Sequence, residues 1–338
     1  MSSKKKSKFP TLMSLNTIEA FQGHLVTWLA DVATTYLINV RLSSSIKDKV
    51  KTLCQMADDY IADLKKRDPN ACRDISLPPP PNFEENYFDL CKAVEVICDY
   101  SRGKMETYVL QPALSLEFTE HVRSFMSSRK LKRDVVGVES VLHGLAVLGA
   151  RISNAYRGME YGYIFIDVPN PEVVDYRKLS GMVIGITRSV NANEGSKLSF
   201  LVGVSSAIAL IYGKTLKEAI EKSLIKVNFV RLTRTGNKVM LKAFEVLDLS
   251  SLADRVYRLG IASPIYNLTS KYPPRERHVL RSFIERLSKA VVTYELLDDY
   301  TEIYSALRIV TSENFLKELR SYDNWKEIID NLLQIRVS

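Results

Sequence analysis

Two pairs of adjacent carboxylates are the residues of this sequence whose spacing could support catalysis. Asp58-Asp59 is followed by Asp63, and Asp298-Asp299 is followed by Glu302. Both groups fall in stretches predicted as helices, where carboxylates four residues apart share one face. Two such helices facing each other could hold Mg²⁺ and substrate phosphates, as in a nuclease or a diphosphate-handling enzyme. The basic residues that such an enzyme needs are absent from the expected places, so we interpret both pairs as acidic helix surface.

Other catalytic signatures are missing from the sequence. Its four histidines form no HExxH motif and no spaced His/Cys cluster, and no GxSxG motif is present. Gly144 and Gly149 lack the Lys-Ser/Thr ending and the preceding strand of a phosphate-binding loop. His24 and His143 lie among apolar residues, which is typical of hydrogen-bonded core histidines. The sequence therefore predicts no catalytic residue, no metal site and no cofactor.

The four cysteines are Cys54, Cys72, Cys91 and Cys98, and their spacings match no zinc-binding pattern. Cys91 and Cys98 could share one face of a helix, two turns apart. In a cytosolic protein, thiols at such positions are usually small buried hydrophobic groups. We therefore expect four reduced, buried cysteines.

A basic β-hairpin predicted over residues 227–244 is the strongest candidate for function. Strand-like segments flank a turn containing Gly236 and Asn237, residues that tolerate the positive φ of a tight turn. Alternate residues of a strand share a face, so Lys238 and Lys242 would point the same way and could reach phosphates or a groove. The alternative is an exposed hairpin whose cations protect its edges. The candidate nucleic-acid contacts here are Arg231, Arg234, Asn237, Lys238 and Lys242.

Three further segments could contact a nucleic acid. The polar loop 191–197 offers amides and a cation, although an ordinary helix connection has the same composition. A run without carboxylates follows His121. A helix predicted to begin at Pro274 has cations in its first turns, where they oppose the helix dipole and therefore suggest another use. The candidate residues are Asn193 and Lys197 in the loop, Arg129, Lys130, Lys132 and Arg133 in the run, and Arg275, Arg277 and Arg281 in the helix.

The positive charge is concentrated in one part of the chain. The net charge is +8, and residues 226–289 alone contain thirteen Lys or Arg against five Asp or Glu. Residues 290–338 contain five basic and nine acidic residues. Clustered basic charge is typical of a protein that binds a polyanion, although the solvated surface of a basic protein gives the same count.

The periodicity of apolar residues predicts a predominantly helical α+β fold with a small antiparallel β element that includes the protruding hairpin. Residues 161–168 read as a strand, and 173–190 are ambiguous between helix and strand. An apolar stripe from Ile18 to Val32 predicts the first helix. The other predicted helices cover 44–66, 85–100, 114–127, 135–156, 197–212 and 215–224, then most of 248–259, 274–299, 300–310, 313–320 and 323–334. We divide the chain into a basic tail (1–10), an N-terminal helical segment (11–77), a proline-rich connector (78–84), a central α+β part (85–245) and a C-terminal helical part (246–338).

The sequence also predicts a cytoplasmic protein with no membrane partner. Its longest nearly uncharged stretch, 198–213, is shorter than the roughly 20 residues that span a bilayer, so we expect a core helix there. Lys4, Lys5, Lys6 and Lys8 are followed by Phe9-Pro10 and by no apolar segment typical of a signal peptide. Gln occurs only four times while Lys, Arg and Glu are plentiful, a balance that leans toward a thermophile.

Three stretches resemble a family of archaeal proteins. They are 148–158 (LGARISNAYRG), 160–167 (EYGYIFID) and 229–238 (FVRLTRTGNK). Together with the length and the helical C-terminal part, they are similar to the large subunit of archaeal type I-A CRISPR interference complexes, called Cascade. The resemblance extends over most of the chain.

The resemblance implies a non-catalytic subunit that binds target DNA and its protospacer-adjacent motif. Its partners would be the other subunits of the complex, the guide RNA and the target DNA, with a helicase or nuclease recruited in trans. Base pairing would read the target, while the protein reads a short motif, shape and phosphates. The alternatives are a magnesium-dependent helical enzyme that uses the acidic pairs and a protein scaffold whose basic faces dock onto acidic partners.

Overall fold

The computed structural model describes residues 25–42, 46–73, 77, 89–104, 107–109, 134–155, 160–235 and 238–335. The chain divides into two compact units. Unit 1 comprises Met1–Ile152 with Arg234–Met240, and unit 2 comprises Ser153–Thr233 with Leu241–Ser338. The predominantly helical α+β class predicted from the sequence is confirmed. The division at Ile152 lies inside the part that we predicted as central, 85–245.

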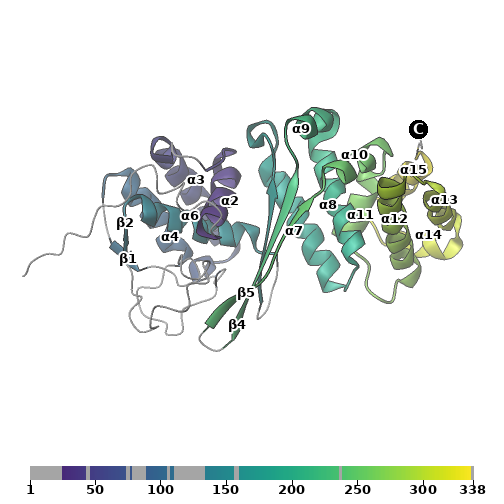
Figure 1. Cartoon of the computed structure of the whole chain (residues 1–338). Coiled ribbons are helices and arrows are strands. Elements are labelled where there is room, and N and C mark those ends of the chain that lie inside the picture. The colour runs from purple at the N-terminus through teal and green to yellow at the C-terminus, as the bar shows by residue number, and fades with distance from the viewer. Residues whose placement is uncertain are drawn as a thin grey trace, which may run out of the picture. The chain divides into compact units, whose positions relative to one another are not determined.

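Unit 1 is a group of helices with a very small sheet (Figure 1). Apolar residues three and four apart on one face of its longest helix are buried, as at Val50, Leu53 and Ala57, and this face packs on the following helix. A short β1–β2 pair lies where we expected loop and helix. The elements are α2 (Leu25–Ile38), α3 (Ile46–Arg67), η1 (Ala71–Arg73), α4 (Leu90–Ser101), β1 (Thr107–Val109), β2 (Asp134–Val136) and α6 (Val138–Ser153).

The glycines of α6 serve close helix packing. A Cβ at Gly149 would lie 1.8 Å from the carbonyl oxygen of Leu29, and one at Gly144 would lie 2.8 Å from that of Ala93. Only glycine therefore allows the backbone of α6 to approach α2 and α4 so closely. His143 on the same helix is buried, and its Nδ1 lies 2.7 Å from the Glu139 carbonyl oxygen. The prediction of a hydrogen-bonded core histidine is confirmed at this position.

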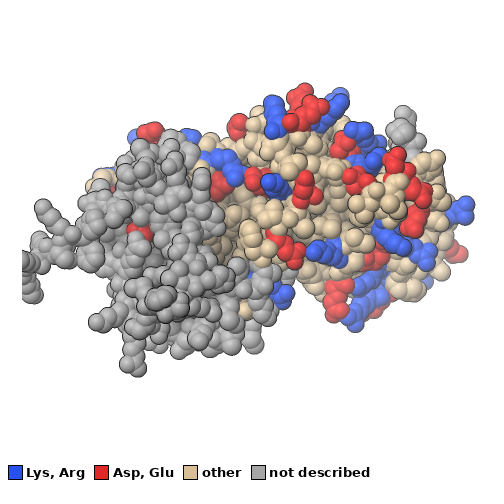
Figure 2. All heavy atoms as spheres, viewed as in Figure 1, with Lys and Arg blue, Asp and Glu red and all other residues tan. Residues whose placement is uncertain are grey.

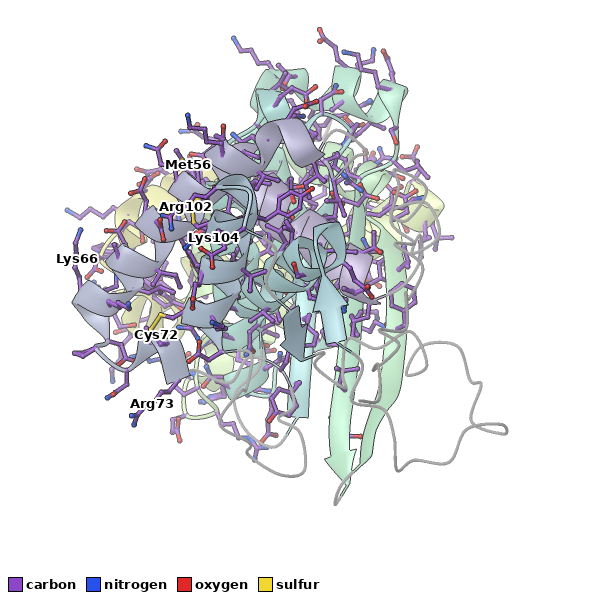
Figure 3. The ribbon with its side chains drawn as sticks, turned by 90° about the vertical axis from the view of Figure 1, so that its left-hand side faces the viewer. Met56, Lys66, Cys72, Arg73, Arg102 and Lys104 are labelled. Carbon is purple, nitrogen blue, oxygen red and sulfur yellow. A yellow bond between two sulfur atoms is a disulfide. The ribbon has the colours of Figure 1, made fainter. Side chains whose placement is uncertain are left out.

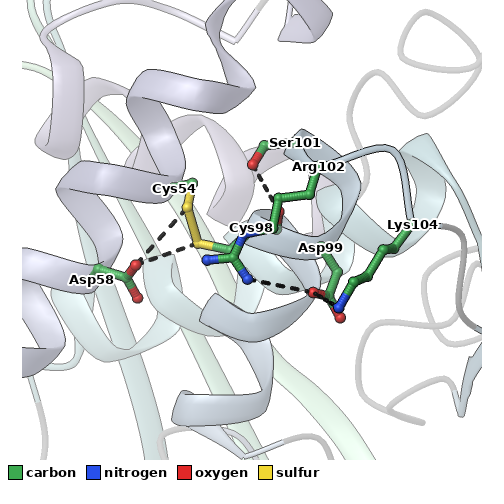
Figure 4. Close-up of a disulfide and its surroundings, with 7 residues drawn as sticks. All are labelled: Cys54, Asp58, Cys98, Asp99, Ser101, Arg102 and Lys104. Atoms are coloured by element: carbon green, nitrogen blue, oxygen red, sulfur yellow. Dashed lines mark hydrogen bonds and ion pairs between the residues drawn. A yellow bond between two sulfur atoms is a disulfide. The ribbon is translucent and has the colours of Figure 1, made fainter.

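The expectation of four reduced, buried cysteines is wrong for this structure. Cys54 of α3 is bonded to Cys98 of α4, and Cys72 of η1 is bonded to Cys91 of α4. Cys98 alone among them is buried. The spacings in sequence did not reveal the pairs because the partners lie on different elements and meet only when α3, η1 and α4 pack together. Figure 3 labels Cys72, and Figure 4 shows the Cys54–Cys98 bond between α3 and α4.

A three-stranded antiparallel sheet of order β3-β4-β5 lies in unit 2, except for Arg234–Met240 at the turn end of the β4–β5 hairpin, which belongs to unit 1. The strands are β3 (Glu160–Asp167), β4 (Lys226–Thr235) and β5 (Lys238–Asp248), so the predicted strand and hairpin are both present. β3 pairs with β4 from Glu160↔Thr233 to Asp167↔Lys226. Tyr163, Ile164, Phe165 and Ile166 are all buried, so both faces of β3 are covered, and the Phe165 ring lies 6.0 Å from that of Tyr176 at the start of α7.

The helices of unit 2 surround α8 (Lys197–Tyr212), which contacts α7, α10, α11 and α12 (Figure 1). By length and composition, the stretch Lys197–Lys222 is one that could cross a membrane, but just over half of it is buried inside the protein. The helix also ends at Gly213, whose φ is 52°. Helix α8 is therefore a core helix, as the sequence predicted. The other helices are η3 (Pro171–Val173), α7 (Tyr176–Ala192), η4 (Gly213–Thr215), α9 (Leu216–Lys222), α10 (Ser250–Arg258), α11 (Ala262–Ser270), α12 (His278–Leu297), α13 (Thr301–Leu307), η5 (Arg308–Thr311), α14 (Glu313–Leu319) and α15 (Trp325–Leu333).

Three sequence-based expectations for unit 2 need correction. The ambiguous stretch 173–190 is mainly helix α7, which continues to Ala192 and so includes the start of the predicted loop. Helix α11 was missed, because its nine residues include Pro264 and several weak helix formers. Helix α12 begins at His278 and not at Pro274, since Arg277, with φ −92° and ψ 62°, is not yet helical.

Candidate nucleic-acid interface

The β4–β5 hairpin is longer than the rest of its sheet. β3 has 8 residues, whereas β4 has 10 and β5 has 11. The last described β3 partner on β4 is Thr233, so Arg234 and Thr235 continue beyond it, in a ribbon that Figure 1 shows as long and narrow. The predicted contacts Arg234, Lys238 and Lys242 have backbone positions on this ribbon, and Arg231 lies on β4 opposite Gly162.

Five predicted contacts lie outside the described residues. They are Asn237 in the turn of the hairpin and the basic run Arg129, Lys130, Lys132 and Arg133. Their part in an interface remains the prediction made from the sequence.

The turn between α7 and α8, residues 193–196, has a closely specified backbone. Gly195 N–H donates to the Val190 carbonyl at 2.7 Å and Glu194 N–H to the Asn191 carbonyl at 3.2 Å, the pattern of a Schellman helix end. Glu194 occupies the left-handed position with φ 52°, where glycine is the usual residue. A Cβ at Gly195 would lie 2.7 Å from Val190 Cγ1. The turn therefore tolerates a side chain at position 194 and excludes one at 195.

Two predicted candidates, the loop 191–197 and the basic segment before α12, meet at this turn. Arg281 donates to the Asn193 carbonyl at 2.8 Å and also to the Glu194 carbonyl, and its guanidinium lies 5.6 Å from the centre of the Tyr272 ring. Arg275 forms an ion pair with Glu194. A cation at the C-terminal end of α7 is favoured by the dipole of that helix. Arg281 and Arg275 therefore stabilise the turn.

Asn193 also binds within the chain. Its Nδ2 donates to the Ser189 and Tyr272 carbonyls, both at 3.0 Å. Arg277 precedes α12 and donates to the Ser321 hydroxyl. We had predicted from Pro274 that Arg275 and Arg277 lie in the first turn of a helix. Both residues instead precede α12, which begins at His278.

A carboxylate links this turn to α12. The carboxylate of Glu285 accepts hydrogen bonds from the Ser196 N–H, at 3.0 Å, and from the Tyr272 hydroxyl. Tyr272 is a buried residue. Burial opposes ionisation of Glu285, but hydrogen bonds from Ser196, Tyr272 and Ser199 outweigh it and lower its pKa. Burial is the largest cause of the raised pKa of Tyr272, and its hydrogen bond to the Glu285 carboxylate raises that pKa further. Sequence reasoning missed Glu285, because nothing in its local pattern points to a residue 89 positions earlier.

Lys197, at the start of α8, pairs with Glu245 of β5 at 3.0 Å. Beside this ion pair lies a pocket of about 290 Å³ lined by side chains of α7, α8, β4 and β5. Phe200, Phe229 and Leu247 give it apolar walls, and Asn191 adds an amide. Such a lining suits a small planar group, for example an unstacked base or an aromatic side chain.

The charges on the described surface are mixed. Figure 2 shows Lys and Arg interleaved with Asp and Glu over the visible face of unit 2. Basic residues concentrated in sequence, such as those of 226–289, therefore do not form a single basic surface on this face.

The second acidic pair, Asp298 and Asp299, does not lie on one face of a helix. Asp298 has the left-handed φ of 54° just after α12, and Asp299 accepts the Thr301 N–H, so neither lies within a helix as we had predicted. Asp298 forms an ion pair with Arg255 at 3.3 Å. In the part of the chain that the structure describes, no metal-ligand group of three side chains includes Asp298 or Asp299.

Comparison of the chain with protein-family models, with curated proteins and with solved structures finds no match in any of the three. The candidate interface must therefore be judged on the residues and their geometry.

Proposed function

We propose that this chain is a non-catalytic nucleic-acid-binding subunit of an RNA-guided DNA interference complex, the large subunit of a type I-A Cascade. In this proposal it works in the cytoplasm and has no cofactor. It contacts target DNA and the protospacer-adjacent motif beside guide RNA and the other subunits, while a recruited helicase or nuclease performs cleavage.

The observation that carries the proposal is the long β4–β5 ribbon. A two-stranded ribbon is narrow enough to enter a nucleic-acid groove. The sequence places Arg234 and Lys238 beside its turn and Lys242 further along β5. The resemblance of residues 148–158, 160–167 and 229–238 to Cascade large subunits supplies the biological context. The apolar pocket beside Lys197 is a suitable second contact for an unstacked base.

A salt titration of DNA binding tests the role of the ribbon. The variant R234E/K238E/K242E replaces three cations by anions, and the control K214E/K217E/K222E makes the same charge change on exposed lysines of η4 and α9. Binding of duplex DNA by the full chain, alone and in its assembly, is measured by fluorescence anisotropy over a range of salt concentrations. The slope of log K against log salt is negative for a protein that binds phosphates. We expect the hairpin variant to make this slope shallower by up to about 3, because each lost phosphate contact reduces its magnitude by about 0.9.

The control separates specific contacts from general electrostatic attraction. An equal loss in both triple variants means that net charge, not the ribbon, determines binding. Unchanged binding by the hairpin variant rules out the ribbon as the interface.

A protein scaffold is the second candidate function, and one observation favours it. Leu296, Leu297, Tyr300 and Tyr304 are exposed together at the end of α12 and in α13, beside Asp298 and Glu302. Contiguous exposed apolar side chains are typical of protein interfaces. Absence of DNA binding at every salt concentration, with assembly into the complex intact, would favour the scaffold.

A further inference from the structure

The contact between the Cys54–Cys98 disulfide and a carboxylate has no use in the oxidised protein. One oxygen of Asp58 lies 3.9 Å from Cys54 Sγ and 3.6 Å from Cys98 Sγ (Figure 4). Neither sulfur of a disulfide carries a proton, so neither can donate a hydrogen bond to this oxygen. Asp58 is exposed and could turn into solvent. Within the described chain, these two sulfurs are the partners of its side chain.

The same three side chains can serve as metal ligands once the S–S bond is broken and the two sulfurs move apart. Their ligand atoms all lie within 4.8 Å of one another, and theirs is the one such group in the described part of the chain. In a tetrahedral zinc site, bond lengths of about 2.3 Å to sulfur and 2.0 Å to oxygen place sulfur and oxygen roughly 3.5 Å apart. The measured distances from Asp58 to the two sulfurs are close to that value.

The elements around the group hold it in place. Cys54 and Asp58 are four residues apart on α3 and therefore share its face, and Cys98 approaches from the packed helix α4. Arg102 pairs with Asp99, the neighbour of Cys98 on α4, at 3.8 Å (Figure 4). Thiols bind metal in their ionised form.

We propose that Cys54, Asp58 and Cys98 bind one Zn²⁺ when the disulfide is reduced, so that this site alternates between a disulfide and a metal centre. A dithiol protein reductant supplies two electrons and two protons, breaks the S–S bond and itself becomes a disulfide. Zinc then displaces both thiol protons to solvent and bonds to two thiolates and one carboxylate oxygen. The fourth position of the tetrahedron is left for water or for a ligand from a partner. The site is independent of the proposed DNA-binding function.

Titration of the full chain with Co²⁺ and then Zn²⁺ tests this site. The chain is reduced with a phosphine under anaerobic conditions, and thiolate-to-cobalt charge-transfer absorption reports bound metal. We expect one ion per reduced chain, displacement of Co²⁺ by Zn²⁺, and no such absorption from the oxidised chain. Asp58→Asn should weaken binding by roughly tenfold or more, because even the loss of an outer-shell partner costs 10–100-fold.

The second cysteine pair provides a matched control. Cys72 and Cys91 are also joined by a disulfide between η1 and α4, but among the described residues no carboxylate completes a group with them. The variant C72S/C91S should therefore keep the ion, and C54S/C98S should lose it. Far-UV circular dichroism of each reduced, metal-free variant checks that the helices remain. Absence of binding by the reduced chain, undiminished binding by Asp58→Asn, or equal loss in both double variants would overturn the proposal.

Discussion

The β4–β5 hairpin and the α7–α8 turn are both basic regions in the sequence, but they belong to different kinds of element, a two-stranded ribbon and the end of a helix. At the turn, Arg281 and Arg275 bind the backbone and the side chain of residues 193–194. On the hairpin, Arg234 and Lys238 occupy the backbone positions that flank the turn, beyond Thr233, the last residue of β4 described as paired with β3. Positive charge in a sequence is therefore no measure of the charge left for a ligand, because a fold can use an arginine to bind its own carbonyl groups.

Replacing Arg281 should produce the largest loss of stability at the turn. Arg281→Ala removes hydrogen bonds to two carbonyls at the end of α7 and a contact with the Tyr272 ring. Hydrogen bonds to charged groups contribute about 1.5–3 kcal/mol each, so we expect a loss of about 3 kcal/mol in the free energy of unfolding. Urea denaturation measures it. Arg286→Ala, an exposed position on the same helix, is the control and should change stability by less than about 0.5 kcal/mol.

The salt dependence of DNA binding then separates the two regions. If Arg281 acts only within the chain, Arg281→Ala leaves the slope of log K against log salt unchanged. A slope reduced by about 0.9 would show that Arg281 also contacts a phosphate, and the contrast with the hairpin would be lost.

Adding one methyl group at Gly195 should destabilise the turn without changing any charge. The new Cβ would lie 2.7 Å from Val190 Cγ1 and 3.0 Å from the ring of Tyr272, which is buried. Overpacking of this kind typically costs about 1–3 kcal/mol, and we expect about 2 kcal/mol for Gly195→Ala in thermal or urea unfolding. Gly181→Ala on α7 is the matched control. Nothing lies within 4 Å of its added Cβ, so the better helix former should stabilise the protein by up to about 1 kcal/mol.

The sequence predicts local elements better than it predicts the contacts between them. The periodicity of α3 and the strand patterns on either side of the hairpin turn depend on neighbours in the chain, and the helix and both strands are confirmed. The role of Arg281 and the pairing of Cys54 with Cys98 depend on residues 88 and 44 positions away. No spacing rule connects such residues. Helix α11 was missed for another reason, because burial against α8 overrides its weak intrinsic preference.

Acidification should weaken the turn through Glu285. The folded state lowers the pKa of Glu285 below its unfolded value of about 4.3. Its contribution to stability is therefore complete above that value and is lost as the pH falls through the folded pKa. We expect Glu285→Gln to cost about 1 kcal/mol at pH 7, because an amide accepts the Ser196 and Tyr272 hydrogen bonds less strongly. Urea unfolding from pH 7 to 3 should show the difference between wild type and Glu285→Gln shrinking below pH 4.3; a difference that is constant with pH contradicts this role.

The ion pair between Arg275 and Glu194 should contribute least, and it is the sharpest test of the contrast between the two regions. Both side chains are about two-thirds exposed, so water screens their attraction, and exposed pairs contribute roughly 0.2–1 kcal/mol. We expect Arg275→Ala to cost about 0.5 kcal/mol in urea unfolding at low salt, and less as salt increases. A larger cost that is independent of salt would mean that Arg275 is as integral to the turn as Arg281. A small cost together with weakened DNA binding would instead place Arg275 with the hairpin, because an exposed arginine can exchange an exposed carboxylate for a phosphate.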